Sequence, residues 1–208
     1  MILFLMVSCN KDVITGSGSI TETVRTPGSF SGLNTEGNVK VHIAYAPEIS
    51  VKLRGYANLI PEFVTEVKNN ILYLHYRDRL NVKHDNIEVF LTMPGFTAIN
   101  TSGSSFIDAE GNFDQAAQLS ILSSGNSEIS IDNMTVENYV VSGSGNCNIA
   151  TVAVNAKTAK IEISGNGTVS LSASEKLDVS ISGSGTVSYK GDPAVTTDIS
   201  GNGKLIKL

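Results

Sequence analysis

Side chains that can form hydrogen bonds recur in a short glycine-containing motif that appears six times in the chain. The motif is Ser-Gly, then Ser or Asn, then Gly or Ser, and its third position is occupied by Ser104, Asn126, Ser144, Asn166, Ser184 and Asn202. Hydroxyl and amide groups both donate and accept hydrogen bonds. This chemistry predicts contact with a hydroxyl-rich ligand such as a glycan. The alternative is that these residues serve only the turns in which they lie.

A second reactive group is the thiol of Cys9, which follows a short apolar run at residues 2–7 and then Ser8. This order resembles the lipobox of a bacterial lipoprotein signal, in which the chain is cleaved before the cysteine and the thiol carries lipid. The alternative is a buried N-terminal strand, but the polar, glycine-rich sequence that follows favours lipidation. We therefore expect a signal peptide over 1–8, a lipid on Cys9 and a flexible tether over 9–19.

The other residue types form no catalytic or metal-binding pattern. The three histidines, His42, His75 and His84, show no close metal-ligand spacing. The motifs carry Ser and Asn where a calcium-binding repeat requires Asp. The carboxylates lie at unmatched offsets from the glycines, so they form no column. We expect no cofactor, no metal and no enzymatic activity. Carboxylates that converge in a groove would instead favour a carbohydrate-active, pectinase-like β-helix enzyme.

The six motifs are positioned by flanking strands. Their first glycines, from Gly103 to Gly201, are spaced 22, 18, 22, 18 and 18 residues apart. The apolar residues four positions after these glycines are Ile107, Ile129, Cys147, Val169, Val187 and Leu205. Strand, glycine turn and strand make a rung that cannot bury its apolar face alone. The repeat predicts an all-β fold, a single-stranded right-handed β-helix or β-solenoid with about 20-residue rungs over 99–208. Cys147 is predicted to be a small core residue.

The third motif position alternates strictly between Ser and Asn along the six copies. This alternation suggests a duplicated unit of two rungs. It predicts that consecutive turns differ in conformation or in side-chain direction.

The N-terminal section, residues 20–98, is β-rich but less regular. Its expected strands cover residues 39–44, 49–53, 71–76 and 87–93. Asn69-Asn70 predicts a tight hairpin turn, and a brief helix is an option over 58–66. We expect this section to cap the rungs, so that residues 20–208 form one body. At the other end, Lys207 in the last rung is interpreted as protection of an exposed strand edge.

Composition limits the possible partners. The 208 residues carry 15 basic and 20 acidic side chains, a net charge of −5, which argues against a nucleic-acid partner. The whole excess lies in residues 99–208, with 11 acids and 6 lysines, because residues 1–98 hold 9 of each sign. No apolar run is long enough for a transmembrane helix.

Several segments together resemble a known family. They are Phe30-Ser31-Gly32-Leu33, Gly37-Asn38-Val39-Lys40-Val41, Asn69-Asn70-Ile71-Leu72, Val89 to Pro94 and the repeated motifs. Over about residues 28–208 the chain is similar to the head GIN domain family, described as auto-transporter adhesins, many of them lipoproteins of Bacteroidetes-type bacteria. The resemblance implies an all-β, solenoid-like fold, a cell-envelope location and an adhesion role. It supplies no catalytic residues.

The sequence therefore predicts a lipid-anchored outer-membrane protein that acts by binding. Its expected partner is a glycan or an envelope or host surface protein, and the N-terminal lipid is its expected contact with the membrane. The periplasmic and the surface face are both open, as is the oligomeric state. The alternatives are the carbohydrate-active protein named above, a structural spacer, and an envelope lipid-binding protein that uses the N-terminal section, where most aromatic residues lie.

Overall fold

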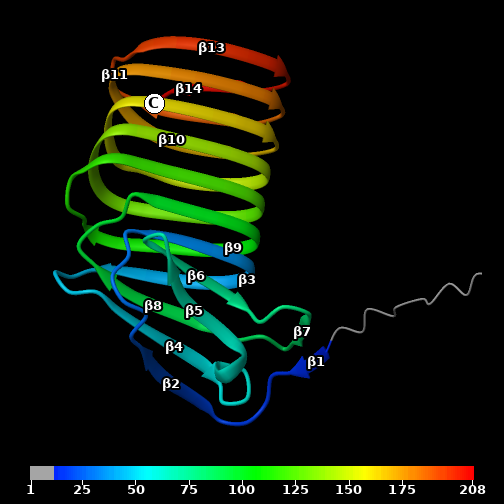
Figure 1. The fold of residues 1–208 in the computed structure, drawn as a ribbon. Helices are drawn as coiled ribbons and strands as arrows, with labels where there is room; N and C mark the ends of the chain where they lie inside the picture. The colour runs from blue at the N-terminus through cyan, green and yellow to red at the C-terminus, as the bar shows by residue number, and fades with distance from the viewer. Residues whose placement is uncertain (1–11) are drawn as a thin grey trace, which may run out of the picture.

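The computed structural model describes residues 12–208 as an all-β protein with one short 3-10 helix (Figure 1). The strands are β1 (Asp12–Thr15), β2 (Ile20–Arg25), β3 (Gly32–Tyr45), β4 (Ser50–Tyr56), β5 (Phe63–Lys68), β6 (Ile71–Tyr76), β7 (Leu80–Lys83), β8 (Glu88–Met93), β9 (Ala98–Asn112), β10 (Ala116–Gly165), β11 (Thr168–Gly183), β12 (Thr186–Lys190), β13 (Ala194–Gly201) and β14 (Lys204–Lys207). The helix η1 covers Ile60–Glu62. Parallel and antiparallel pairs both occur, so the large sheet is mixed. Residues 12–208 contain no helix that is long and apolar enough to cross a membrane.

Parallel pairing of successive passes of the chain builds the main body. β3 pairs with β9, β9 with β10, and β10 with β11, while β11 pairs with both β12 and β13. Equivalent repeat positions lie side by side, as in the pairs Gly103 with Gly125 and Gly183 with Gly201. Figure 1 shows these passes as coils stacked from β3 to β13. The predicted in-register stacking of the repeats is confirmed for these pairs.

One bend of every coil is formed by a glycine with positive φ. These residues, called the glycine column below, are Gly37, Gly103, Gly125, Gly145, Gly165, Gly183 and Gly201. Their φ values lie between 86° and 124°, which side chains with a Cβ resist. A Cβ on any of the upper six would also lie within 2.8 Å of the carbonyl oxygen of the glycine beneath it. Glycine is therefore required both by the dihedral angle and by the close stacking.

The third repeat enters this column through Gly145 and not through Gly143. Gly143 is buried and faces the interior, where an added Cβ would lie 2.6 Å from the Cys147 sulfur. The predicted register of this repeat is therefore wrong by two residues, and Ile149 occupies the core position assigned to Cys147. The sequence Ser-Gly-Ser-Gly-Asn offers two glycines, and a shift of two residues preserves the inward and outward alternation. With this register, Asn146 replaces Ser144 at the position after the glycine, so Ser and Asn no longer alternate strictly along the column. The prediction that consecutive turns alternate therefore loses its basis.

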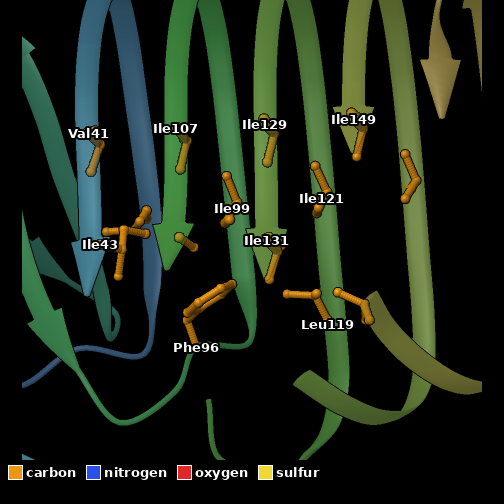
Figure 2. Packing of buried hydrophobic residues seen from close by; sticks show 14 of the residues in the cluster. Val41, Ile43, Phe96, Ile99, Ile107, Leu119, Ile121, Ile129, Ile131 and Ile149 are labelled. Atoms are coloured by element: carbon orange, nitrogen blue, oxygen red, sulfur yellow. The ribbon is translucent and has the colours of Figure 1, made fainter. Parts of the chain in front are cut away.

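The core is filled by inward side chains that stack from coil to coil. Val41, Ile107, Ile129 and Ile149 form one such row, and all four are fully buried (Figure 2). Burial of each such side chain contributes about 1.5–3 kcal/mol. Next to the glycine column in the upper coils, a branched residue on one side fills the space left by glycine on the other, as Ile163 does beside Gly167.

The N-terminal section covers the first coil with shorter strands. β4 lies antiparallel between β8 and β2, and β8 pairs in parallel with β3. The predicted hairpin turn is confirmed, because Asn69 and Asn70 join β5 to β6 with φ of 50° and 65°. β1 pairs in parallel with β7. The expected flexible tether over 9–19 is thus too long, because residues 12–15 belong to a strand; residues 1–11 lie outside the described range.

The opposite end of the stack is open. Every residue of β13 is exposed, and Val195 and Ile199 are 40% and 39% exposed. Lys207 continues an inward row that holds Tyr189 in the previous coil, and its Nζ lies 2.5 Å from Asp192 Oδ1. The last coil therefore presents apolar side chains and one neutralised lysine to solvent.

Candidate functional site

Two polar columns flank the glycine column on its exposed side. The residues directly after the glycines form the amide column, which consists of Asn38, Ser104, Asn126, Asn146, Asn166, Ser184 and Asn202. The residues directly before them are Glu36 and then six serines, Ser102, Ser124, Ser144, Ser164, Ser182 and Ser200. Five of the six predicted contact residues therefore lie in one column. Ser144 lies in the other column, and Asn146 takes its place in the amide column. Asn146 was not predicted, because the predicted register of this repeat was wrong by two residues.

Asparagines of the amide column bond to one another along the stack. Asn146 Nδ2 donates to Asn126 Oδ1 over 3.1 Å, and Asn166 Nδ2 donates to Asn146 Oδ1 over 3.4 Å. The backbone is fixed as well, because Asn166 N donates to the carbonyl oxygen of Gly145 over 2.9 Å. The middle residue, Asn146, keeps one N–H and one lone pair for a ligand. The column is thus a preorganised row of donors and acceptors.

A shallow hollow of about 380 Å³ lies beside the first four coils of this column. Asn38, Ser104, Asn126 and Asn146 line one side, and outward side chains of the adjoining strands line the other. Phe106 is the aromatic residue there, and its strand neighbours are Lys40 and Glu128. Its ring is half-buried, so it offers apolar surface next to the amides.

A larger groove of about 600 Å³ crosses β9, β3, β8, β4 and β2 on the same outer face. The His42 and Phe90 rings stack there with centroids 5.1 Å apart, and Lys52 Nζ lies 5.3 Å from the Phe90 centroid on the other side. The ring of Phe106 lies 5.8 Å from that of His42, which joins the hollow to the groove. We call Phe106, His42, Phe90 and Lys52 the aromatic row.

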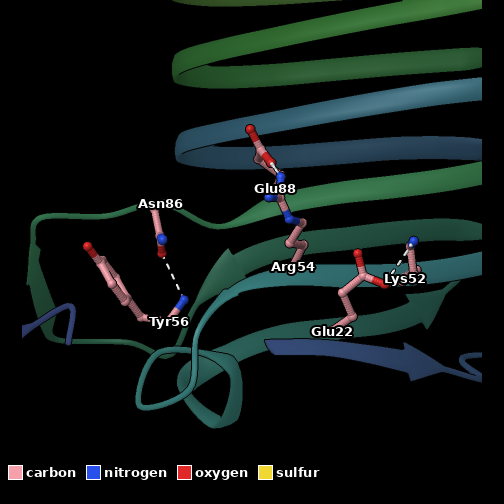
Figure 3. A network of polar contacts seen from close by, with 6 residues as sticks. All are labelled: Glu22, Lys52, Arg54, Tyr56, Asn86 and Glu88. Atoms are coloured by element: carbon pink, nitrogen blue, oxygen red, sulfur yellow. Dashed lines mark hydrogen bonds and ion pairs between the residues drawn. The ribbon is translucent and has the colours of Figure 1, made fainter. Parts of the chain in front are cut away.

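The basic residues Lys52 in the groove and Arg54 beside it are held in ion pairs. Lys52 pairs with Glu22 and Arg54 with Glu88, each over 3.1 Å (Figure 3). Such exposed pairs contribute roughly 0–1 kcal/mol each. Asp108 and Glu110 lie at the β9 edge of the groove, and Asp108 accepts a hydrogen bond of 2.6 Å from Ser130. Among residues 12–208, no group of three His, Cys, Asp or Glu side chains could hold a metal ion.

Sequence analysis missed the aromatic row. His42 was assigned only to a strand, Phe90 belongs to an apolar segment that looks like core, and Phe106 directly follows the first repeat motif. The alternation within β3, β8 and β9 places all three side chains outward. That signal is present in the sequence, but the pairing of β3 with both β8 and β9 brings them together.

The remaining special residue, Cys147, is a buried thiol that forms no disulfide within residues 12–208, and its burial is as predicted for a core cysteine. Burial raises the pKa of its thiol, so little thiolate forms at pH 8. In a Cys9→Ala variant, we expect a disulfide reagent at pH 8 to react with Cys147 at least roughly tenfold more slowly in buffer than in urea. Equal rates in both solvents would contradict the buried position.

Fold and site together define a class: an all-β protein with a mixed sheet, whose exposed features at the candidate site are hydroxyls, amides and aromatic rings. Within this class the family can be assigned. Residues 29–193 match the family described as "putative auto-transporter adhesin, head GIN domain". The chain belongs to this family, as its sequence resemblance predicted. The sequence matches no curated protein.

Solved structures share the fold at low sequence identity. A "putative adhesin" from Bacteroides fragilis is 18% identical, with a TM-score of 0.77 over 94% of this chain and 100% of that one. A "putative adhesin" from Parabacteroides distasonis is 20% identical, with a TM-score of 0.58 over 95% and 100%. A "putative lipid binding protein" from the same species is also 20% identical, with a TM-score of 0.55 over 95% and 100%.

Proposed function

We propose that this protein is a cell-envelope adhesin that binds glycans through the hollow and the aromatic row, without catalysis. One observation carries the proposal: the half-buried ring of Phe106 shares a hollow with the bonded amides of Asn126 and Asn146. A sugar has apolar C–H faces and a rim of hydroxyls. An aromatic ring suits the first, and fixed amides with free donors and acceptors suit the second.

The family supports a binding role, because it is described by adhesion. Its solved relatives are likewise named as adhesins or as a binding protein. Asp108 and Glu110 are the carboxylates that an enzyme would use in the groove. Their position makes cleavage of the glycan the outcome that any binding experiment must include.

Two finer features belong to the same proposal. The stacked coils, from β3 through residues 99–208, are a single-stranded right-handed β-solenoid capped by the other strands of residues 20–98; parallel pairing at each repeat supports this architecture. Residues 1–8 are a signal peptide, and Cys9, outside the described residues, carries the lipid that anchors the protein in the outer membrane.

The test is a screen of glycans and polysaccharides with the full chain carrying Cys9→Ala, with mass spectrometry of each ligand after incubation. For a bound glycan, we expect Phe106→Ala to weaken affinity by roughly tenfold or more, as for a buried aromatic contact. Asn146→Ala is expected to weaken it as well. Asn202→Ala is the matched control, because Asn202 belongs to the same column but lies outside the hollow.

Binding without cleavage, sensitive to Phe106 and Asn146 but not to Asn202, would support the proposal. Shortened products would replace it with an enzyme that uses the groove. Binding of phospholipid alone would favour the lipid-binding alternative, and no binding of any glycan would overturn the assignment.

A further inference from the structure

The first described strand, β1, is fixed to the N-terminal end of the body. Besides its pairing with β7, Asp12 N donates to Arg79 O over 3.0 Å and Gly16 N donates to Lys83 O over 2.8 Å. The amide of Asn58 bridges the following segment, donating to Thr15 O over 2.8 Å and accepting from Ser17 N over 2.9 Å. A group attached just before Asp12 is therefore held next to a rigid surface.

The distance from this strand to the proposed lipid is short. Two residues, Asn10 and Lys11, separate Cys9 from Asp12. Three residue steps span at most about 11 Å, even for a fully extended chain. A lipid on Cys9 therefore brings β1 and β7 to the level of the headgroups.

The outward face of this strand pair suits that location. Ile14 and Val82 pack against the core, so Val13, Thr15, Asn81 and Lys83 alternate outward. Val13 is 58% exposed, and Lys83 and the neighbouring Arg79 are exposed. Among the described residues Lys83 and Arg79 have no ion-pair partner, whereas Arg77 pairs with Asp12 and Glu62. Asp78 is the one acidic side chain of this turn without such a partner among the same residues.

The charge of the rest of the molecule favours an orientation in which β1 and β7 face the membrane. Residues 99–208 carry 6 lysines and 11 acids, a net charge of −5, whereas residues 1–98 are balanced at 9 and 9. β1 lies at the end of the body opposite β13 (Figure 1). An anionic surface attracts Arg79 and Lys83 and repels the distal coils.

From these observations we infer that the β1–β7 face (Val13, Thr15, Arg79, Asn81 and Lys83) docks on the anionic phospholipid bilayer that holds the Cys9 lipid. This inference rests on the proposed lipid anchor and adds a second, protein-mediated contact to it. Docking makes the stack stand on the membrane with its open end, β13 and β14, pointing away. The protein then has a fixed orientation relative to the membrane, which a flexible lipid tether alone would not give it.

The experiment places a fluorescent probe at each end of the lipidated full chain. All variants carry Cys147→Ala, and the probe is attached through Asn81→Cys on the docking face or Ser200→Cys at the open end. The proteins are reconstituted in phosphatidylcholine vesicles that contain phosphatidylglycerol and a headgroup-attached quencher. We expect strong quenching at position 81 and almost none at position 200. Mass spectrometry of each sample reports the lipid on Cys9.

Charge reversal tests the contact itself. Arg79→Glu with Lys83→Glu is expected to lower the docked fraction by at least roughly fivefold, since each basic residue near an anionic bilayer contributes about that factor. Lys190→Glu with Lys204→Glu makes the same change in net charge at the open end and should leave quenching unchanged. Equal quenching at both probes in lipidated protein would overturn docking alone. A Cys9 without lipid would overturn both docking and the proposed anchor, and would leave glycan binding to its own test.

Discussion

Replacing Gly145 by Ala is expected to destabilise the fold by roughly 3 kcal/mol or more, enough to unfold a protein of ordinary stability in part. Its φ of 97° already costs a residue with a Cβ about 1–2 kcal/mol. The added Cβ would also lie 2.6 Å from the carbonyl oxygen of Gly125, and backbone on both sides leaves little room to relax. Urea unfolding followed by circular dichroism measures the loss.

Gly37 is the matched control for this substitution. It belongs to the same column and has a φ of 86°, but an added Cβ would meet nothing within 4 Å because no coil lies beneath it. Gly37→Ala should therefore cost only the conformational part, about 1 kcal/mol. Equal losses at the two positions would contradict the stacked column.

Replacing Cys9 by Ala is expected to move the protein from the membrane fraction to the soluble fraction almost completely. Lipid chains contribute about 0.8 kcal/mol for each buried CH₂ group, and two or more chains anchor a protein stably. Within the described residues, the β1–β7 face offers one exposed apolar side chain, Val13, and two cations without an ion-pair partner, so it cannot replace that energy. The measurement is membrane fractionation with immunoblotting in the host bacterium.

Cys147→Ala is the control for this second prediction, because it removes the only other cysteine of the chain. Cys147 is buried in the core and should have no part in membrane retention. Retention of Cys9→Ala in the membrane fraction would exclude lipidation as the anchor. Loss of Cys147→Ala from the membrane together with its solubility would instead report a folding defect.

The repeat made most of the stacked body predictable. Six motifs and their alternating flanks identified the strands, the side-by-side pairing and the inward rows. The third copy was misaligned because Gly143 and Gly145 differ by two residues, the period of a strand, so pattern alone cannot separate them. The neighbouring coils decide between them, since Gly145 fits above Gly125 and below Gly165.

The candidate site was predictable only where it follows the repeat. The amide column is a repeat feature, so five of its members were found from the motifs. The aromatic row depends on which strands become neighbours in the irregular N-terminal section. β8 returns beside β3 after a long excursion through β4 to β7, which brings Phe90 against His42. Local patterns carry no information about that pairing.

The number of glycines in the column also sets its height. Adjacent parallel strands lie about 4.8 Å apart, so the six steps from Gly37 to Gly201 give the glycine column a height of roughly 29 Å. Because each coil contacts only its neighbours, duplication or deletion of a whole coil between Gly125 and Gly165 changes this height and leaves both ends intact. Length can therefore evolve in fixed increments, independently of how one end is attached and of what the side surface recognises.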